Sequence, residues 1–89
     1  MSLQILSSPS DPDKLVDDLH RAIARALPNA KIEVSASGAG HFEIRVESES
    51  FANQSRVAQQ QTVYAAIAPL MRGDAAPVHA IDKLETRVP

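Results

Sequence analysis

The chain has 89 residues, 44% of them hydrophobic, and this length allows one domain with a single thin core. It contains no cysteine, which excludes disulfides and all-thiolate metal sites and fits a reducing compartment. Nine basic and eleven acidic residues give a formal net charge of −2, so binding to nucleic-acid phosphates would need a local basic patch.

The opening stretch, MSLQILSSPS, has neither the basic start nor the apolar run of a signal peptide. No later stretch is long and apolar enough to span a membrane. We therefore expect a cytoplasmic protein that does not associate with membranes. Residues 1–9 are expected to form a short mobile arm, and residues 10–89 a single domain.

The residues that follow predict an amphipathic helix. Asp11 is a suitable N-cap in front of Pro12, and Pro28 ends the helical pattern. Apolar residues recur at spacings of three and four, at Leu15, Val16, Leu19, Ala22, Ile23, Ala26 and Leu27. His20 lies at the boundary of this stripe, and we interpret it as a surface histidine without a functional role.

The next stretch, AKIEVSASGAGHFEIRVES, predicts a β-hairpin because apolar and polar residues alternate in both halves. Setting Glu33 opposite Arg45 pairs opposite charges and also brings the apolar residues of the two strands into register. This register leaves residues 38–40 as a three-residue loop closed by Ser37 and His41, with a glycine in the left-handed conformation. His41 is therefore expected at the hairpin tip.

A second helix is predicted over NQSRVAQQQTVYAAIAPLM. Its apolar stripe is expected to contain Val57, Tyr64, Ile67 and Met71, with Val63 and Leu70 beside it. Three consecutive glutamines, residues 59–61, lie in the middle of this helix. We expect them on a partly exposed face, where they either bind a partner surface or contact solvent.

The last segment, VHAIDKLETRVP, has the alternation of a strand, but the alternation slips after Ile81. A bulge near Asp82 and Lys83 would reconcile its two halves. The predicted order is α-β-β-α-β, an α+β fold with a three-stranded mixed sheet and helices on one face. If the last strand is parallel to the second strand of the hairpin, both begin at the same end of the sheet, and His79 lies near His41.

These two histidines are the candidate metal ligands. His79 opens a strand after a loop, where an imidazole can be both anchored and accessible to solvent, and His41 has a similar position. A purely structural role for either histidine is the alternative. Two imidazoles without a thiolate do not complete a metal centre, so a site for a soft metal would need ligands from a partner.

Other chemistry has little support in the sequence. There is no nucleophile elbow, phosphate loop or HExxH motif, and we expect no enzymatic activity. The chain also lacks a G-x-x-G loop and has only three aromatic residues for stacking on bases. A nucleic-acid role would be favoured if the fold gathered four basic residues into one contiguous face: Arg56, Arg72, Lys83 and Arg87.

The stretches HFEIRVESESF, SRV, QQTVY and VHAI, in this order and spacing, resemble the BolA family. The form SRVxxQQTVY is similar to the IbaG-like bacterial branch of that family. The resemblance covers about Ala30 to Ile81 and implies a fold like a type II KH domain. Two departures are Asn53, at a position where the family has glycine, and one extra residue in the last strand.

The resemblance implies a function as well. BolA-like proteins pair with monothiol glutaredoxins in heterodimers that hold a glutathione-ligated [2Fe-2S] cluster. His79 matches the family histidine that ligates this cluster, and His41 is the only candidate here for a second ligand from the hairpin loop. We expect a non-enzymatic adaptor in iron homeostasis or cluster delivery, without a cluster in the isolated protein.

The alternative is a KH-like nucleic-acid-binding regulator of transcription or the stress response. It would use the four basic residues named above. A homodimer is also left open by the sequence.

Overall fold

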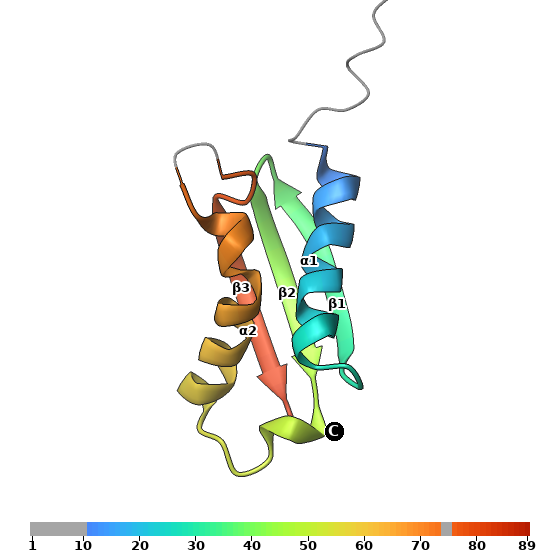
Figure 1. Ribbon diagram of the computed structural model, residues 1–89, viewed down its shortest axis with the longest axis vertical. Coiled ribbons are helices and arrows are strands. Elements are labelled where there is room, and N and C mark those ends of the chain that lie inside the picture. Colours follow the sequence, from blue (N-terminus) through green and yellow to red (C-terminus); the bar gives the residue numbers. More distant parts are fainter. Residues whose placement is uncertain (1–10, 74–75) are drawn as a thin grey trace, which may run out of the picture.

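The computed structural model describes residues 11–73 and 76–89 (Figure 1). Its elements are α1 (Pro12–Ala26), β1 (Lys31–Gly38), β2 (His41–Glu47), a short 3-10 helix (Glu49–Phe51), α2 (Arg56–Met71) and β3 (Ala80–Arg87). The expected α-β-β-α-β order is confirmed. The arm expected at residues 1–9 lies outside the described residues. None of the described helices has the length and apolar character needed to cross a membrane.

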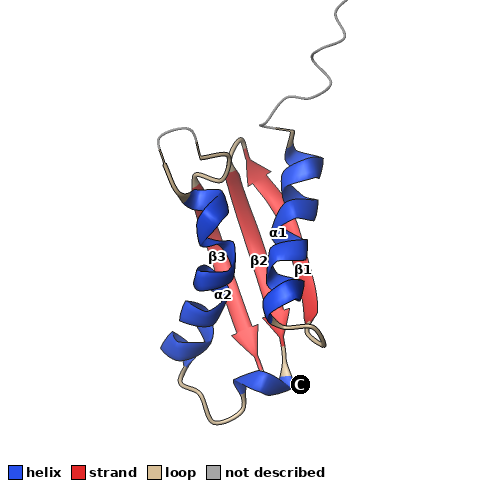
Figure 2. Cartoon of the chain, viewed as in Figure 1, coloured by secondary structure: helices blue, strands red, loops and turns tan. Residues whose placement is uncertain are grey.

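The three strands form one mixed sheet in the order β1-β2-β3. β1 and β2 are antiparallel, whereas β2 and β3 are parallel and are joined through α2. Both helices lie on the same face of the sheet, with α1 against β1 and α2 against β3 (Figure 2). The opposite face of the sheet, here called the open face, is not covered by any described helix.

Side chains cap both helices, as the backbone groups at helix starts require. Asp11 accepts a 3.0 Å hydrogen bond from the backbone N–H of Asp13, which confirms it as the N-cap of α1. Ser55 caps α2 in the same way. Asn53, in the loop before α2, has a φ of 67°, the left-handed conformation that a glycine would otherwise supply.

The register of the hairpin is as expected, with Glu33 opposite Arg45. The hairpin tip differs from the prediction. Gly38, not Ser37, pairs with His41, so the expected three-residue loop is wrong: two residues form the tip and Ser37 is bulged out of the pairing. Gly40 takes the left-handed conformation, with a φ of 74°. The bulge at Ser37 absorbs the extra residue and frees this side chain from the regular alternation of β1.

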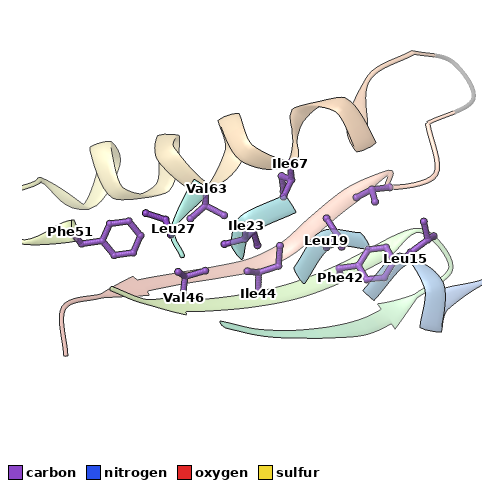
Figure 3. Close-up of a cluster of buried hydrophobic side chains, with 11 residues drawn as sticks. Leu15, Leu19, Ile23, Leu27, Phe42, Ile44, Val46, Phe51, Val63 and Ile67 are labelled. Atoms are coloured by element: carbon purple, nitrogen blue, oxygen red, sulfur yellow. The ribbon is translucent and has the colours of Figure 1, made fainter. Parts of the chain in front are cut away.

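The hydrophobic core lies between the helices and the sheet (Figure 3). The buried cluster consists of Leu15, Leu19, Ile23, Leu27, Phe42, Ile44, Val46, Phe51, Val63, Ile67 and Val78. It takes one stripe from each helix and one face of the sheet, which is the arrangement that a two-layer domain needs to bury its apolar surface.

The buried face of α2 differs from the prediction. Val57 is 63% exposed and Tyr64 is 40% exposed, so assigning them to the buried stripe was wrong. The buried positions are Gln59, Val63 and Ile67, four residues apart. Because α2 carries apolar residues around much of its circumference, their pattern alone does not identify the face that packs on the sheet. The polar Gln59 is buried because its amide finds partners there.

Candidate functional site

The two candidate ligands lie at the edge where β2 and β3 begin. His41 is paired with Ala80, the residue after His79. The backbone N–H groups of His79 and Ala80 both donate to the carbonyl oxygen of Gly40, at 2.8 and 3.1 Å. The parallel pairing thus brings the two histidines to neighbouring positions, as the topology predicted.

The His79 ring packs against the hairpin tip. Gly40 is buried, and a Cβ at this position would overlap Cδ2 of the His79 ring and lie 2.9 Å from its Cγ. The ring therefore occupies the space that a side chain at residue 40 would fill. His79 itself is exposed. Its imidazole is anchored on one side by the backbone and remains accessible on the other.

The His41 ring is held by hydrogen bonding instead. Its Nδ1 lies 2.9 Å from Oδ1 of Asp82, and the Ser37 hydroxyl donates to the other carboxylate oxygen at 2.8 Å. These hydrogen bonds, that from His41 first, hold the pKa of Asp82 below its usual range. The side chains of His41 and Asp82 are 46% and 42% exposed. Together with Ser37 they form a surface cluster of three residues: Ser37 from β1, His41 from β2 and Asp82 from β3.

Irregularities in the two outer strands produce this cluster. In β3 the pairing moves from Phe42–Ile81 to Glu43–Lys83, which leaves Asp82 as the bulged residue and confirms the expected bulge. Ser37 is the bulged residue of β1. The sequence predicted the bulge, but neither Asp82 as the partner of His41 nor Ser37 as the second partner of Asp82 was expected. The only signal for Asp82 was the extra residue in the last strand.

His41 and His79 nevertheless have different surroundings. His41 points to Asp82 at the edge of the open face, whereas His79 lies over Gly40. Across residues 11–73 and 76–89, no three His, Asp or Glu side chains lie together as a metal-binding set. A metal bound at either imidazole would need further donors. His20, interpreted as a surface histidine, is exposed on α1.

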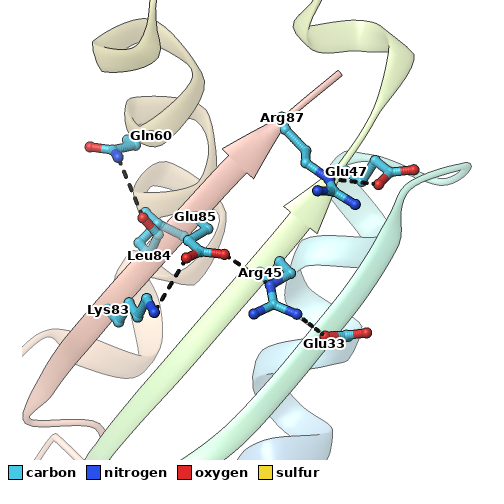
Figure 4. Close-up of polar contacts among 8 residues, drawn as sticks. All are labelled: Glu33, Arg45, Glu47, Gln60, Lys83, Leu84, Glu85 and Arg87. Carbon is cyan, nitrogen blue, oxygen red and sulfur yellow. Dashed lines mark hydrogen bonds and ion pairs between the residues drawn. The ribbon is translucent and has the colours of Figure 1, made fainter. Parts of the chain in front are cut away.

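The four basic residues of the alternative hypothesis are dispersed. Arg56 begins α2 and Arg72 follows its end, so a helix of 16 residues, about 24 Å, separates them. Lys83 and Arg87 are on β3 and contact Glu85 and Glu47 at 3.3 and 2.9 Å (Figure 4). The structure does not bring these residues together into a basic face.

The open face carries alternating charges. Arg45 lies at its centre and contacts Glu33 on β1 at 3.0 Å and Glu85 on β3 at 2.9 Å (Figure 4). These contacts raise the pKa of Arg45, mainly through the hydrogen bond to Glu85, and lower that of Glu85. In the neighbouring row the charges are reversed: positive, negative and positive, at Lys31, Glu47 and Arg87. A surface of this kind does not provide the continuous positive groove that a phosphate backbone requires.

The three glutamines of α2 have three different environments. Gln59 is buried; its amide donates to the carbonyl oxygens of Gln54 and Phe51 at 3.1 and 3.4 Å and accepts from the Thr86 hydroxyl at 2.8 Å. Gln60 donates to the backbone of β3 at 3.5 Å, and Gln61 is exposed. Gln59 thus links α2 to β3 and to the preceding loop, and the expectation of a partly exposed position is wrong for this glutamine.

Comparison with known proteins is informative about family and fold. The family model described as BolA-like protein matches residues 19–89 of this chain. A BolA protein homologue from Coxiella burnetii is 31% identical, with 82% of this chain and 88% of that chain covered and a TM-score of 0.64. No curated protein sequence matched this chain.

Two further structures are similar at lower identity. The BolA domain of SufE1 from Arabidopsis thaliana is 18% identical, with 84% of this chain and 92% of that chain covered and a TM-score of 0.71. Yeast Fra2 is 20% identical, with coverages of 89% and 80% and a TM-score of 0.62. At these identities the likeness concerns the fold alone, and it confirms the expected BolA-like fold. The IbaG-like branch stays a prediction.

Proposed function

The chain belongs to the BolA-like protein family, and from this membership we propose that it is a non-enzymatic adaptor for a monothiol glutaredoxin. In this proposal the chain supplies histidine ligation to a [2Fe-2S] cluster that it shares with the glutaredoxin and with glutathione. The setting is iron homeostasis or cluster delivery.

The placement of His79 carries the proposal. Its ring packs against Gly40 while the side chain remains exposed, so a ligating nitrogen can be presented to another molecule without a rearrangement of the chain. Imidazole nitrogen is a suitable ligand for iron and replaces thiolate on one iron in Rieske-type [2Fe-2S] centres. The donor chemistry of this edge therefore fits the cluster.

The number of donors supports a shared site. A [2Fe-2S] cluster takes four ligands from its surroundings. This chain has no cysteine, and His79 and His41 are the two imidazoles at the edge of the sheet. Two thiolates, one from the glutaredoxin and one from glutathione, would complete the set. When bound, the cluster supplies one-electron chemistry and transferable iron and sulfide.

The proposal is tested by anaerobic cluster assembly with a monothiol glutaredoxin and glutathione, followed by visible circular dichroism. Wild-type protein is expected to change the spectrum of the glutaredoxin cluster into that of a mixed complex. His79→Ala is expected to abolish this change. His20→Ala is the matched control, because it removes an exposed imidazole on α1, away from the edge, and should leave the mixed spectrum intact.

Two results would contradict the proposal. One is a wild-type protein that never perturbs the glutaredoxin cluster, and the other is a mixed spectrum that survives His79→Ala. After the first result, the next measurement would be the salt dependence of nucleic-acid binding, which is the signature of phosphate contacts.

A further inference from the structure

The Asp82 carboxylate determines which nitrogen of His41 carries a proton. An exposed aspartate is ionised at neutral pH, so the Asp82 carboxylate can only accept hydrogen bonds. The 2.9 Å contact to Nδ1 of His41 therefore requires a proton on Nδ1. In a neutral imidazole this leaves Nε2 unprotonated, with a lone pair available for ligation.

The same carboxylate also restricts where the His41 ring can point. One oxygen of Asp82 binds His41 and the other binds Ser37, so the carboxylate is held at two points. The two strand bulges place these groups on either side of β2. Bulges re-aim side chains, and here the residue of one bulge, Asp82, binds His41 while the residue of the other, Ser37, binds Asp82. His41 and His79 are thus oriented by different means, the first by a carboxylate and the second by the backbone at Gly40.

Histidines that bind metals usually donate their other ring N–H to a carboxylate or carbonyl group, which sets the tautomer and the orientation of the ring. We propose that Asp82 is a positioning residue for His41, which it holds through Nδ1–H so that Nε2 is the nitrogen presented to the cluster. This inference rests on the proposed ligand role of His41. It adds a residue, Asp82, to the site and assigns the ligating atom.

The first test needs no cluster. Long-range proton–nitrogen NMR spectra of the isolated, 15N-labelled protein, recorded at alkaline pH where histidine side chains are neutral, report the tautomer of each imidazole. Wild-type His41 is expected to carry its proton on Nδ1. In Asp82→Ala this signature should be lost in favour of the Nε2–H form that an unrestrained imidazole prefers. His20 serves as an internal reference that should not change.

Two further variants separate positioning from general disturbance. Asp82→Asn keeps a carbonyl oxygen that can accept from Nδ1–H, and it should partly restore the wild-type tautomer. Ser37→Ala removes only the second anchor of the carboxylate, so Nδ1–H should persist. Far-UV circular dichroism should match that of wild type in all variants, because these side chains are exposed and outside the core.

The second test uses the mixed complex with glutaredoxin and glutathione. Asp82→Ala should weaken formation of the mixed complex by about 10–100-fold, the usual effect of losing a partner of a metal-bound histidine. Its visible spectrum should approach that of His41→Ala. Both results support the inference, provided that the tautomer changes as well.

Different failures have different meanings. If the tautomer of His41 is the same in Asp82→Ala and wild type, Asp82 does not position the ring and the inference is wrong. If His79→Ala abolishes the mixed spectrum while His41→Ala and Asp82→Ala leave it unchanged, the adaptor function stands and the inference is overturned. If His79→Ala has no effect, the proposed function itself fails.

Discussion

The buried glutamine of α2 allows a quantitative prediction about stability. Gln59→Ala removes an amide that bridges the loop before α2, the helix and β3. The Thr86 hydroxyl, on a residue that is only 3% exposed, then loses its acceptor. The Phe51 carbonyl is less affected, because it also accepts a 3.1 Å hydrogen bond from the Gln54 N–H.

The magnitude follows from these contacts. A buried polar group left without a partner costs about 1–3 kcal/mol. Loss of the buried Cγ methylene group of the side chain adds about 1 kcal/mol. We therefore expect Gln59→Ala to lower the free energy of unfolding by about 2–4 kcal/mol, a large part of what a small domain possesses. The exposed Gln61→Ala should change it by less than about 0.5 kcal/mol.

Urea denaturation followed by far-UV circular dichroism measures both variants under identical conditions. A double-mutant cycle then tests whether the lost hydrogen bond between Gln59 and Thr86 causes the destabilisation. Gln59→Leu keeps most of the volume but leaves Thr86 unsatisfied, and adding Thr86→Val removes the second polar partner. The double variant should recover most of the stability that Gln59→Leu loses, since removal of both hydrogen-bond partners is close to neutral. Equal stabilities of Gln59→Ala and Gln61→Ala would refute this reasoning.

Two further predictions concern the sheet edge and the open face. Gly40→Ala should displace the His79 ring, seen as a large shift of the His79 NMR signals and a weakened mixed complex with glutaredoxin. Gly73→Ala is the matched control: its φ of 89° imposes similar backbone strain, but a Cβ there meets no other atom of the described chain within 4 Å. If both variants shift His79 equally, the steric explanation fails. The second prediction concerns pH, because the hydrogen bond from Arg45 lowers the pKa of Glu85 in the folded protein. The stabilisation is present above the ordinary pKa of 4.5 and is lost as the pH falls through the lower folded value. Wild type should therefore exceed Glu85→Gln in stability at neutral pH, and the difference should shrink in acid and in high salt. A difference that does not depend on pH would contradict this assignment.

Short-range sequence patterns predicted correctly those elements for which several patterns agree, such as capping, apolar periodicity and charge pairing. The first helix has a capping residue at Asp11 and a clear apolar stripe, and both point to the same boundaries. In the hairpin, the charge pair Glu33–Arg45 and the apolar alternation demand a single register. The slip after Ile81 predicted a bulge near Asp82 and Lys83, and the structure places it at Asp82. In each case the information lies within a few residues along the chain.

In the second helix, the sequence signals did not agree on which face is buried. Val57 and Tyr64 fit a helical stripe, but α2 packs on the sheet through Gln59, Val63 and Ile67. Which stripe is buried depends on how the helix sits over β3, and a polar residue is tolerated there only because Thr86 and two backbone carbonyls meet its amide. These partners come from other elements, so no local pattern could reveal them.

The sequence by itself determined the order of the elements, the hairpin register and, through its motifs, the BolA-like family and the two candidate histidines. Only the tertiary structure decided what surrounds those histidines. Asp82 is 41 residues from His41 along the chain, and they meet because β3 lies parallel to β2 and is bulged at that point. Gly40 meets His79 for the same reason. Contacts across a sheet depend on strand pairing, and strand pairing is a property of the whole fold.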